Sequence, residues 1–128
     1  MKIVVLKFGG TSVGSIDRIK KVTKIIISYL KKKYKVIVVS SAISGETNRL
    51  AKLTKQISNN FPSSEYDSIV STGEQISCAL IAGRLNHLGY LSRSWLGWQI
   101  PIFTTGNYSN SRIYSINKKK ILQFLKQG

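Results

Sequence analysis

Two short apolar runs near the start of the chain each end in small and hydroxyl residues. IVVL lies within Lys2–Lys7 and VIVV within Lys35–Ser40. Unbroken β-branched runs of this kind are typical of strands buried in a parallel sheet. Between them, apolar residues recur in steps of three and four after Ser15, which predicts a helix capped by that serine: Ile16, Ile19, Val22, Ile26 and Leu30. We therefore expect a right-handed βαβ unit with parallel strands.

The periodicity of the next segment predicts mainly helices. We first expect an amphipathic helix that is capped around Thr47 and marked by Leu50, Leu53 and Ile57, followed by a loop at Asn59–Ser64. A short helix at Tyr66–Val70 comes next. A longer helix then runs from Glu74 through Ile76, Leu80 and Leu88. Gly89 should stop that helix as the residue after its end.

The last third mixes strand and helix signals. The predicted strands or edge segments are Tyr90–Trp95, Ile100–Thr104 and SRIYSI, and Asn117 is expected to cap a last helix ending at Gly128. The predicted class is α/β, a parallel-type sheet with flanking helices. At 128 residues and 42% hydrophobic content the chain fits one compact domain.

No apolar run approaches the roughly 18 residues that cross a bilayer. Met1 leads directly into a strand and not into a signal segment, so we expect a cytoplasmic protein with no membrane partner. Cys78 is the single cysteine, which excludes an internal disulfide, and it falls in an apolar run. His87 has no partner at ligand spacing, so no metal site is expected from the protein's own residues.

The formal net charge of +15 would attract any polyanion. The basic residues are mainly lysines on expected outer faces and helix ends, as in LKKKYK and NKKKILQFLK, which favours a solvated surface over specific nucleic-acid readout. A basic module that binds nucleic acid or an anionic membrane remains an alternative, and it rests on the charge alone.

Both predicted strands end in turns suited to a ligand. KFGGTSVG and SSAISGETN lie at carboxyl ends, where open α/β sheets bind ligands. Gly9 and Gly10 allow close approach and unusual backbone conformations, so that N–H groups and the following helix can face an anion, with Lys7 at the rim. Ser15 stands where a Walker A loop needs lysine, so this is a different phosphate cradle, or simply a tight turn.

Three motifs together carry a family resemblance. KFGGTSVG, SSAISGETN and STGEQIS, in this order and spacing, are similar to aspartate kinase, which belongs to the amino-acid kinase fold, and TTGNYSNSRIYSI also resembles the segment that follows. The resemblance runs from Met1 to Gly128. A relative acting on glutamate, carbamate or a nucleotide is the runner-up, and the second and third motifs favour aspartate.

The resemblance implies ATP-dependent phosphorylation of the L-aspartate side chain to 4-phospho-L-aspartate, the first step towards lysine, threonine and methionine, with ATP and Mg²⁺ as cofactors. It assigns catalysis to Lys7, which would neutralise the transferring phosphoryl group, and ATP binding to Lys7, Phe8, Gly9 and Gly10. It assigns substrate binding to Ser41, Thr47 and Glu74, with Thr11 and Ser12 as further candidate hydroxyls. The plainer interpretations are turn or cap residues for Ser41 and Thr47, and a favourable helix-end charge for Glu74.

The resemblance also implies what lies outside this sequence. A T-L-G-R-G-G-S-D type segment, a later acidic loop and the regulatory domains of the family do not occur in it. We therefore expect residues 1–128 to be the N-terminal portion of an amino-acid kinase domain, weak or inactive alone. Either the fragment is inert, or a separate chain supplies the missing half.

Overall fold

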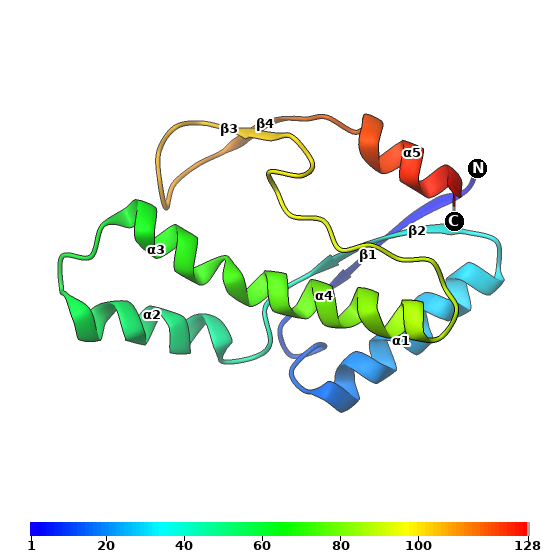
Figure 1. Ribbon diagram of the computed structural model, residues 1–128, viewed down its shortest axis with the longest axis horizontal. Helices are drawn as coiled ribbons and strands as arrows, with labels where there is room; N and C mark the ends of the chain where they lie inside the picture. Colours follow the sequence, from blue (N-terminus) through cyan, green and yellow to red (C-terminus); the bar gives the residue numbers. More distant parts are fainter. Residues whose placement is uncertain (128) are drawn as a thin grey trace.

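The computed structural model describes residues 1–127 as two small sheets and five helices (Figure 1). The elements are β1 (Ile3–Phe8), α1 (Ile16–Lys31), β2 (Lys35–Ser40), α2 (Glu46–Ile57), α3 (Ser63–Val70), α4 (Thr72–His87), β3 (Ile102–Thr104), β4 (Ile113–Ile116) and α5 (Lys119–Gln127). The expected helix end at Gly128 lies outside the described residues.

The predicted βαβ unit is confirmed. β1 and β2 pair in parallel, with Ile3 opposite Lys35 and Phe8 opposite Ser40. Ser15 caps α1 as expected, because its Oγ accepts the backbone N–H of Arg18 at 3.3 Å. Ile19, Val22 and Ile26 of α1 are buried, but Ile16 is exposed because the helix begins at this residue, beyond the sheet.

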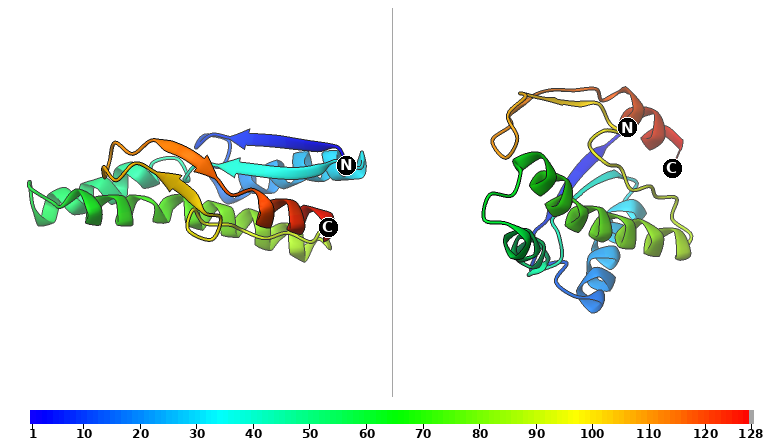
Figure 2. Two further views of the ribbon diagram at one scale, coloured as in Figure 1. Left: turned by 90° about the horizontal axis from the view of Figure 1, so that it is seen from above. Right: turned by 60° about the vertical axis from the view of Figure 1, so that its left-hand side comes forward.

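One face of the β1–β2 sheet forms the core. Leu6 and Phe8 of β1 and Val36 and Val38 of β2 pack against α1 and α4, where the buried residues are Val13, Ile19, Val22, Ile26, Ile81 and Leu85. The opposite face carries Ile3, Val5 and Val39, which are all exposed. Figure 2 shows that α1 and α4 lie to the same side of this sheet.

α4 begins at Thr72 and not at Glu74, and the apolar residues that marked it in the sequence are not the ones it buries. Ile76, Leu80 and Leu88 are 44%, 39% and 41% exposed, whereas Gly73, Ser77, Ile81, Ala82 and Leu85 are buried. Apolar residues surround α4 on all sides, so periodicity alone did not identify the side that packs against α1 and β2. On α2, Leu50 is buried, but Leu53 and Ile57 are exposed.

The structure also revises the expected boundaries and strands. α3 begins at Ser63, inside the predicted loop, and Gly89 ends α4 with φ of +82°, as expected. Tyr90–Trp95 is not a strand, because it has no ladder partner among residues 1–127. β3 and β4 form an antiparallel hairpin, and the side chain of Asn117 accepts the backbone N–H of Lys119 at 3.1 Å before α5.

Candidate functional site

The carboxyl ends of β1 and β2 hold the first two motifs side by side. Beyond the Phe8–Ser40 pair, the backbone N–H of Ser41 donates to the Phe8 carbonyl at 3.0 Å. The ladder thus extends one residue past β2. It sets the glycine-rich loop after β1 next to the turn after β2, at the edge where parallel sheets bind ligands.

The glycine-rich loop folds back on itself before α1. The N–H groups of Ser12 and Val13 both donate to the Gly9 carbonyl, at 2.9 and 3.3 Å, and Nη1 of Arg18 donates to the Thr11 carbonyl at 2.7 Å. Within residues 1–127, the N–H groups of Gly9 and Gly10 donate to no other backbone carbonyl. These two donors are therefore available to an anion.

Gly9 and Gly10 are important because they have no side chain, and not because they adopt unusual backbone angles. Neither has a positive φ, so the expectation of a conformation closed to other residues is wrong. A Cβ on Gly10 would lie 3.2 Å from the Ala42 carbonyl oxygen, which is tighter than normal packing. A Cβ on Gly9 would meet nothing within 4 Å, so this backbone is open to a ligand.

Lys7 is exposed near the end of β1. Its neighbours Leu6 and Phe8 pack in the core, so alternation along the strand directs Lys7 to the uncovered face of the sheet. Among the described residues the ion pairs are Lys20–Asp17 and Arg49–Glu46, and neither involves Lys7. The charge of Lys7 is therefore available to a ligand at the strand end.

The second motif is tied to the start of α4, which carries the third. The Ala42 backbone N–H donates to Oε1 of Glu74 at 3.2 Å. Oγ of Ser77, a residue with no exposed surface, donates to the Ser41 carbonyl at 2.7 Å. The structure therefore brings together the segments that hold Ser41 and Glu74, as the motif interpretation requires.

Close packing between Gly73 and Ala42 makes this junction possible. A Cβ on Gly73 would lie 2.8 Å from Cβ of Ala42, closer than real Cβ atoms approach, and 3.7 Å from Cδ1 of Leu50. Gly73 thus allows α4 to meet the turn after β2. Sequence reasoning missed both Gly73 and Ser77. A glycine and a serine within STGEQIS, on the side of the helix that carries Ile81, were the available signal.

Thr47 does not have its expected role as a cap. Gly45, with φ of +84°, precedes the first residue of α2, and Thr47 lies exposed in the first turn. Within residues 1–127 its hydroxyl makes no hydrogen bond to protein, and no bond joins it to Glu74. Thr47 is therefore near the turn by sequence, but the structure does not fix its side chain.

Glu46 and Arg49 form an ion pair that sequence reasoning also missed. Nε and Nη2 of Arg49 donate to the two carboxylate oxygens of Glu46 at 2.9 and 2.7 Å. This two-bond contact, helped by the Arg49 charge, lowers the pKa of Glu46 below its ordinary value, although some desolvation opposes it. Glu46 remains ionised beside the candidate site.

The described residues do not form a magnesium site by themselves. Residues 1–127 contain no group of three His, Cys, Asp or Glu side chains that could hold a metal ion. In the same part of the chain no helix is long and apolar enough to cross a membrane.

Comparison with known proteins agrees with the motifs. The family model described as "Amino acid kinase family" matches residues 2–128. The chain is 45% identical to an aspartokinase of Geobacillus stearothermophilus and 44% identical to an aspartate kinase of Pseudomonas putida, in each case over 100% of this chain and 31% of the relative.

A solved structure has a similar fold. The aspartate kinase of Synechocystis superposes with a TM-score of 0.66 at 41% identity, covering 69% of this chain and 15% of that one. The chain spans about a third of the length of the curated relatives it matches. With the family model matching almost every residue, the chain belongs to the amino acid kinase family.

Proposed function

We propose that residues 1–128 form the nucleotide-binding and substrate-binding part of an aspartate kinase domain, which transfers the γ-phosphoryl group of ATP to the side-chain carboxylate of L-aspartate. The observation that carries this proposal is the Ala42–Glu74 hydrogen bond, since it joins the second and third motifs beside the first. The names of the relatives support aspartate as the acceptor.

The phosphate end of the site would use the β1 loop. Phosphoryl transfer needs positioning and neutralisation of charge more than covalent chemistry. The free N–H groups of Gly9 and Gly10 would bind phosphate oxygens, Phe8 would hold the loop against the core, and Lys7 would offset negative charge on the transferring group.

The substrate end would use the turn after β2 and the first turn of α4. One oxygen of the exposed Glu74 carboxylate accepts the Ala42 N–H, so the other is available to the ammonium group of aspartate. The hydroxyls of Ser41 and Thr47 would bind its α-carboxylate. The product, an acyl phosphate, is reactive and would serve as the first intermediate towards lysine, threonine and methionine.

We expect residues 1–128 alone to bind nucleotide but to turn over weakly or not at all. The relatives are about three times as long, so other parts of such a domain complete the site in this proposal. A single strand end with two free N–H groups and one lysine offers few of the contacts that hold a triphosphate in line.

Nucleotide titration followed by NMR tests the phosphate site directly. ATP should shift the amide signals of Gly9 and Gly10, and Lys7→Ala should weaken binding about tenfold or more, the usual consequence of losing a charge-assisted contact. Lys2→Ala is the matched control, because Lys2 is an exposed lysine next to the other end of β1.

The same titration separates the proposal from non-specific attraction. If the +15 charge alone draws ATP to the surface, Lys7→Ala and Lys2→Ala will weaken binding equally, and moderate salt will abolish it. That result would favour the basic-module alternative and contradict the phosphate site.

A further inference from the structure

The side chain of Arg18, in the first turn of α1, contacts the backbone of the glycine-rich loop. Its Nη1 donates to the Thr11 carbonyl at 2.7 Å. The backbone N–H of the same residue donates to Oγ of Ser15, the helix cap, at 3.3 Å. The helix start therefore fixes the backbone of Arg18, and the guanidinium reaches from there to the loop that precedes the helix.

The Thr11 carbonyl is the main partner of this guanidinium. In the part of the chain that the structure describes, no carboxylate pairs with Arg18, since the ion pairs there are Lys20–Asp17 and Arg49–Glu46. A hydrogen bond from a charged donor is stronger than one between neutral groups. The carbonyl also accepts the Gly14 N–H, but at 3.4 Å. Arg18 therefore makes the stronger of the two contacts that hold this carbonyl.

The contact fixes one peptide plane of the loop. In a trans peptide the C=O and the following N–H point in opposite directions, and the described residues contain no cis peptide bond. Arg18 binds the Thr11 carbonyl at one end of the plane. At the other end, the Ser12 N–H donates to the Gly9 carbonyl at 2.9 Å. The plane between Thr11 and Ser12 is thus held at both ends, and it cannot rotate without breaking these bonds.

The Gly9 carbonyl connects this plane to the candidate anion site. It accepts the N–H groups of Ser12 and Val13, so it points into the loop. The Gly10 N–H lies in the same peptide plane as that carbonyl and therefore points the opposite way, out of the loop. This N–H is one of the two donors available to an anion. Its direction depends on the Gly9–Ser12 hydrogen bond and, through the next peptide plane, on Arg18.

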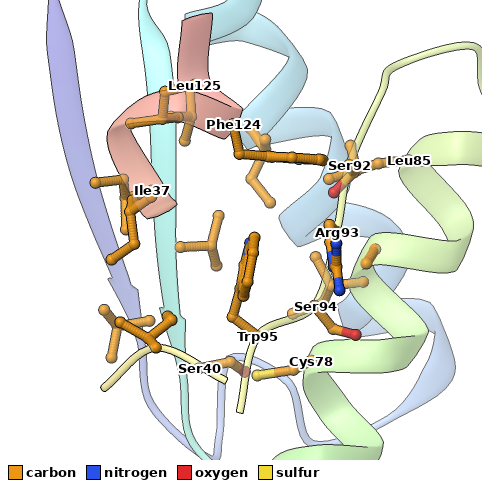
Figure 3. Close-up of a pocket in the computed structure, with 18 of the residues that line it drawn as sticks. Ile37, Ser40, Cys78, Leu85, Ser92, Arg93, Ser94, Trp95, Phe124 and Leu125 are labelled. Carbon is orange, nitrogen blue, oxygen red and sulfur yellow. The ribbon is translucent and has the colours of Figure 1, made fainter. Parts of the chain in front are cut away.

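Packing gives the loop little other support. Thr11 and Ser12 are exposed, and Val13 is the residue of this turn that enters the core. A cavity of about 300 Å³ lies beside β2, α4 and α5, and Figure 3 shows Trp95 pointing into it. None of the residues that line this cavity lies between positions 9 and 18. Hydrogen bonds, and not the filling of that cavity, therefore set the direction of the loop's N–H groups.

We propose that Arg18 is a positioning residue, which directs the Gly10 N–H towards the phosphate of a nucleotide by holding the Thr11 carbonyl. The inference rests on the proposed function in taking that anion to be ATP. Arg18 does not touch the nucleotide, and its effect passes through two peptide planes. A loop that is ordered before its ligand arrives binds more tightly, because less conformational entropy is lost on binding.

Hydrogen exchange of the Ser12 amide, measured by NMR without nucleotide, tests the inference in three variants. Arg18→Ala removes the donor, and exchange should become about fivefold faster or more as the loop loosens. Arg18→Lys keeps a charged donor and should stay close to wild type. Lys21→Ala is the matched control, because it removes an equal charge from an exposed position of the same helix. Since Arg18 is exposed and alanine favours helix, Arg18→Ala should remain folded, which urea unfolding confirms.

Titration of the same variants with ATP gives the second readout. Arg18→Ala should bind ATP about fivefold more weakly, and Arg18→Lys should retain most of the affinity. Equal weakening in Arg18→Ala and Lys21→Ala would overturn the proposal, because the charge on α1 would then be the whole effect. Weaker ATP binding with unchanged Ser12 exchange would also overturn it, because Arg18 would then contact the nucleotide directly.

Failure of the inference can be distinguished from failure of the proposed function. If ATP does not shift the Gly9 and Gly10 amides of the wild-type chain, the proposed function is contradicted. The Ser12 measurement needs no nucleotide and decides the role of Arg18 by itself. Faster Ser12 exchange in Arg18→Ala would still support Arg18 as the residue that fixes the loop, and unchanged exchange would overturn the inference.

Discussion

The backbone N–H of Ala42 and the carboxylate of Glu74 meet at 3.2 Å, although 32 residues separate them in sequence. This bond fastens the start of α4 to the turn after β2. It therefore orients Glu74 at the strand ends, beside the glycine-rich loop. The proposed division of the site into a phosphate end and a substrate end depends on this junction.

Glu74 should have separable structural and electrostatic roles. Glu74→Gln keeps an oxygen that can accept the Ala42 N–H, so its stability should remain within about 0.5 kcal/mol of wild type. Glu74→Ala loses that acceptor and should lose about 1 kcal/mol. If the carboxylate receives the ammonium group of aspartate, both variants should weaken aspartate binding. Calorimetric titration and urea unfolding measure the two effects. Unchanged aspartate affinity in Glu74→Gln would remove Glu74 from the substrate site.

Substitution of two glycines of α4 by alanine should change the stability of the fold in opposite directions. Gly73→Ala would place Cβ 2.8 Å from Cβ of Ala42 and should destabilise the fold by about 1–3 kcal/mol through overpacking. Gly83→Ala meets nothing within 4 Å and should stabilise the helix by roughly 0.5–1 kcal/mol. Thermal unfolding of both variants checks the pair. Equal stability of Gly73→Ala and wild type would mean that α4 does not pack against the turn this closely.

The buried hydroxyl of Ser77 should contribute more to the stability of the fold than an exposed serine hydroxyl does. Ser77→Ala leaves the Ser41 carbonyl without its 2.7 Å donor and should cost about 1–3 kcal/mol. Ser28→Ala removes a bond of equal length to the Ile25 carbonyl, but at an exposed site where water replaces it, and should change stability by less than about 0.5 kcal/mol. Chemical denaturation of the two variants gives the comparison, and similar losses in both would contradict the buried network.

The titration of Glu46 should report its pair with Arg49. The Arg49 hydrogen bonds lower the pKa of Glu46 below its ordinary 4.5. Because the folded-state pKa is depressed, the contribution of the pair is present above pH 4.5 and is lost as pH falls through the folded-state pKa. Arg49→Ala should return that pKa towards 4.5, and 1 M salt should do so in part, since the pair is accessible to solvent. Carboxyl NMR shifts measure this, and an unchanged pKa in Arg49→Ala would exclude the pair in solution.

The sequence predicted best those elements whose stabilising contacts are local or occur between neighbours in the chain. β1, α1 and β2 follow from apolar runs, helical spacing and the Ser15 cap, and all three are confirmed. Tyr90–Trp95 failed as a strand because a strand requires a partner, and none of the described residues provides one. The hydrophobic pattern of a segment does not show whether a partner strand is present beside it.

The candidate site was predicted in outline and not in detail. The sequence order of the two strands predicted that the turn holding Ser41 would lie beside Gly9 and Gly10, because parallel strands end at one edge, and the β1–β2 ladder has this arrangement. The contacts that hold α4 against that turn, through Gly73 and Ser77, depend on which side of α4 is buried. A helix with apolar residues all round does not reveal this. Thr47 was predicted to cap α2 because threonine is common at helix starts, but Gly45 precedes the first residue of the helix.

Aspartate-dependent release of ADP from ATP and Mg²⁺ tests the central claim most directly. It should be measured on the chain alone and on the chain mixed with the remaining part of the G. stearothermophilus aspartokinase, with association of the two polypeptides confirmed by size-exclusion chromatography. The account predicts activity that appears only in the mixture, survives Lys2→Ala and is lost in Lys7→Ala. No activity in a mixture shown to have associated, or activity that Lys7→Ala leaves intact, would contradict it.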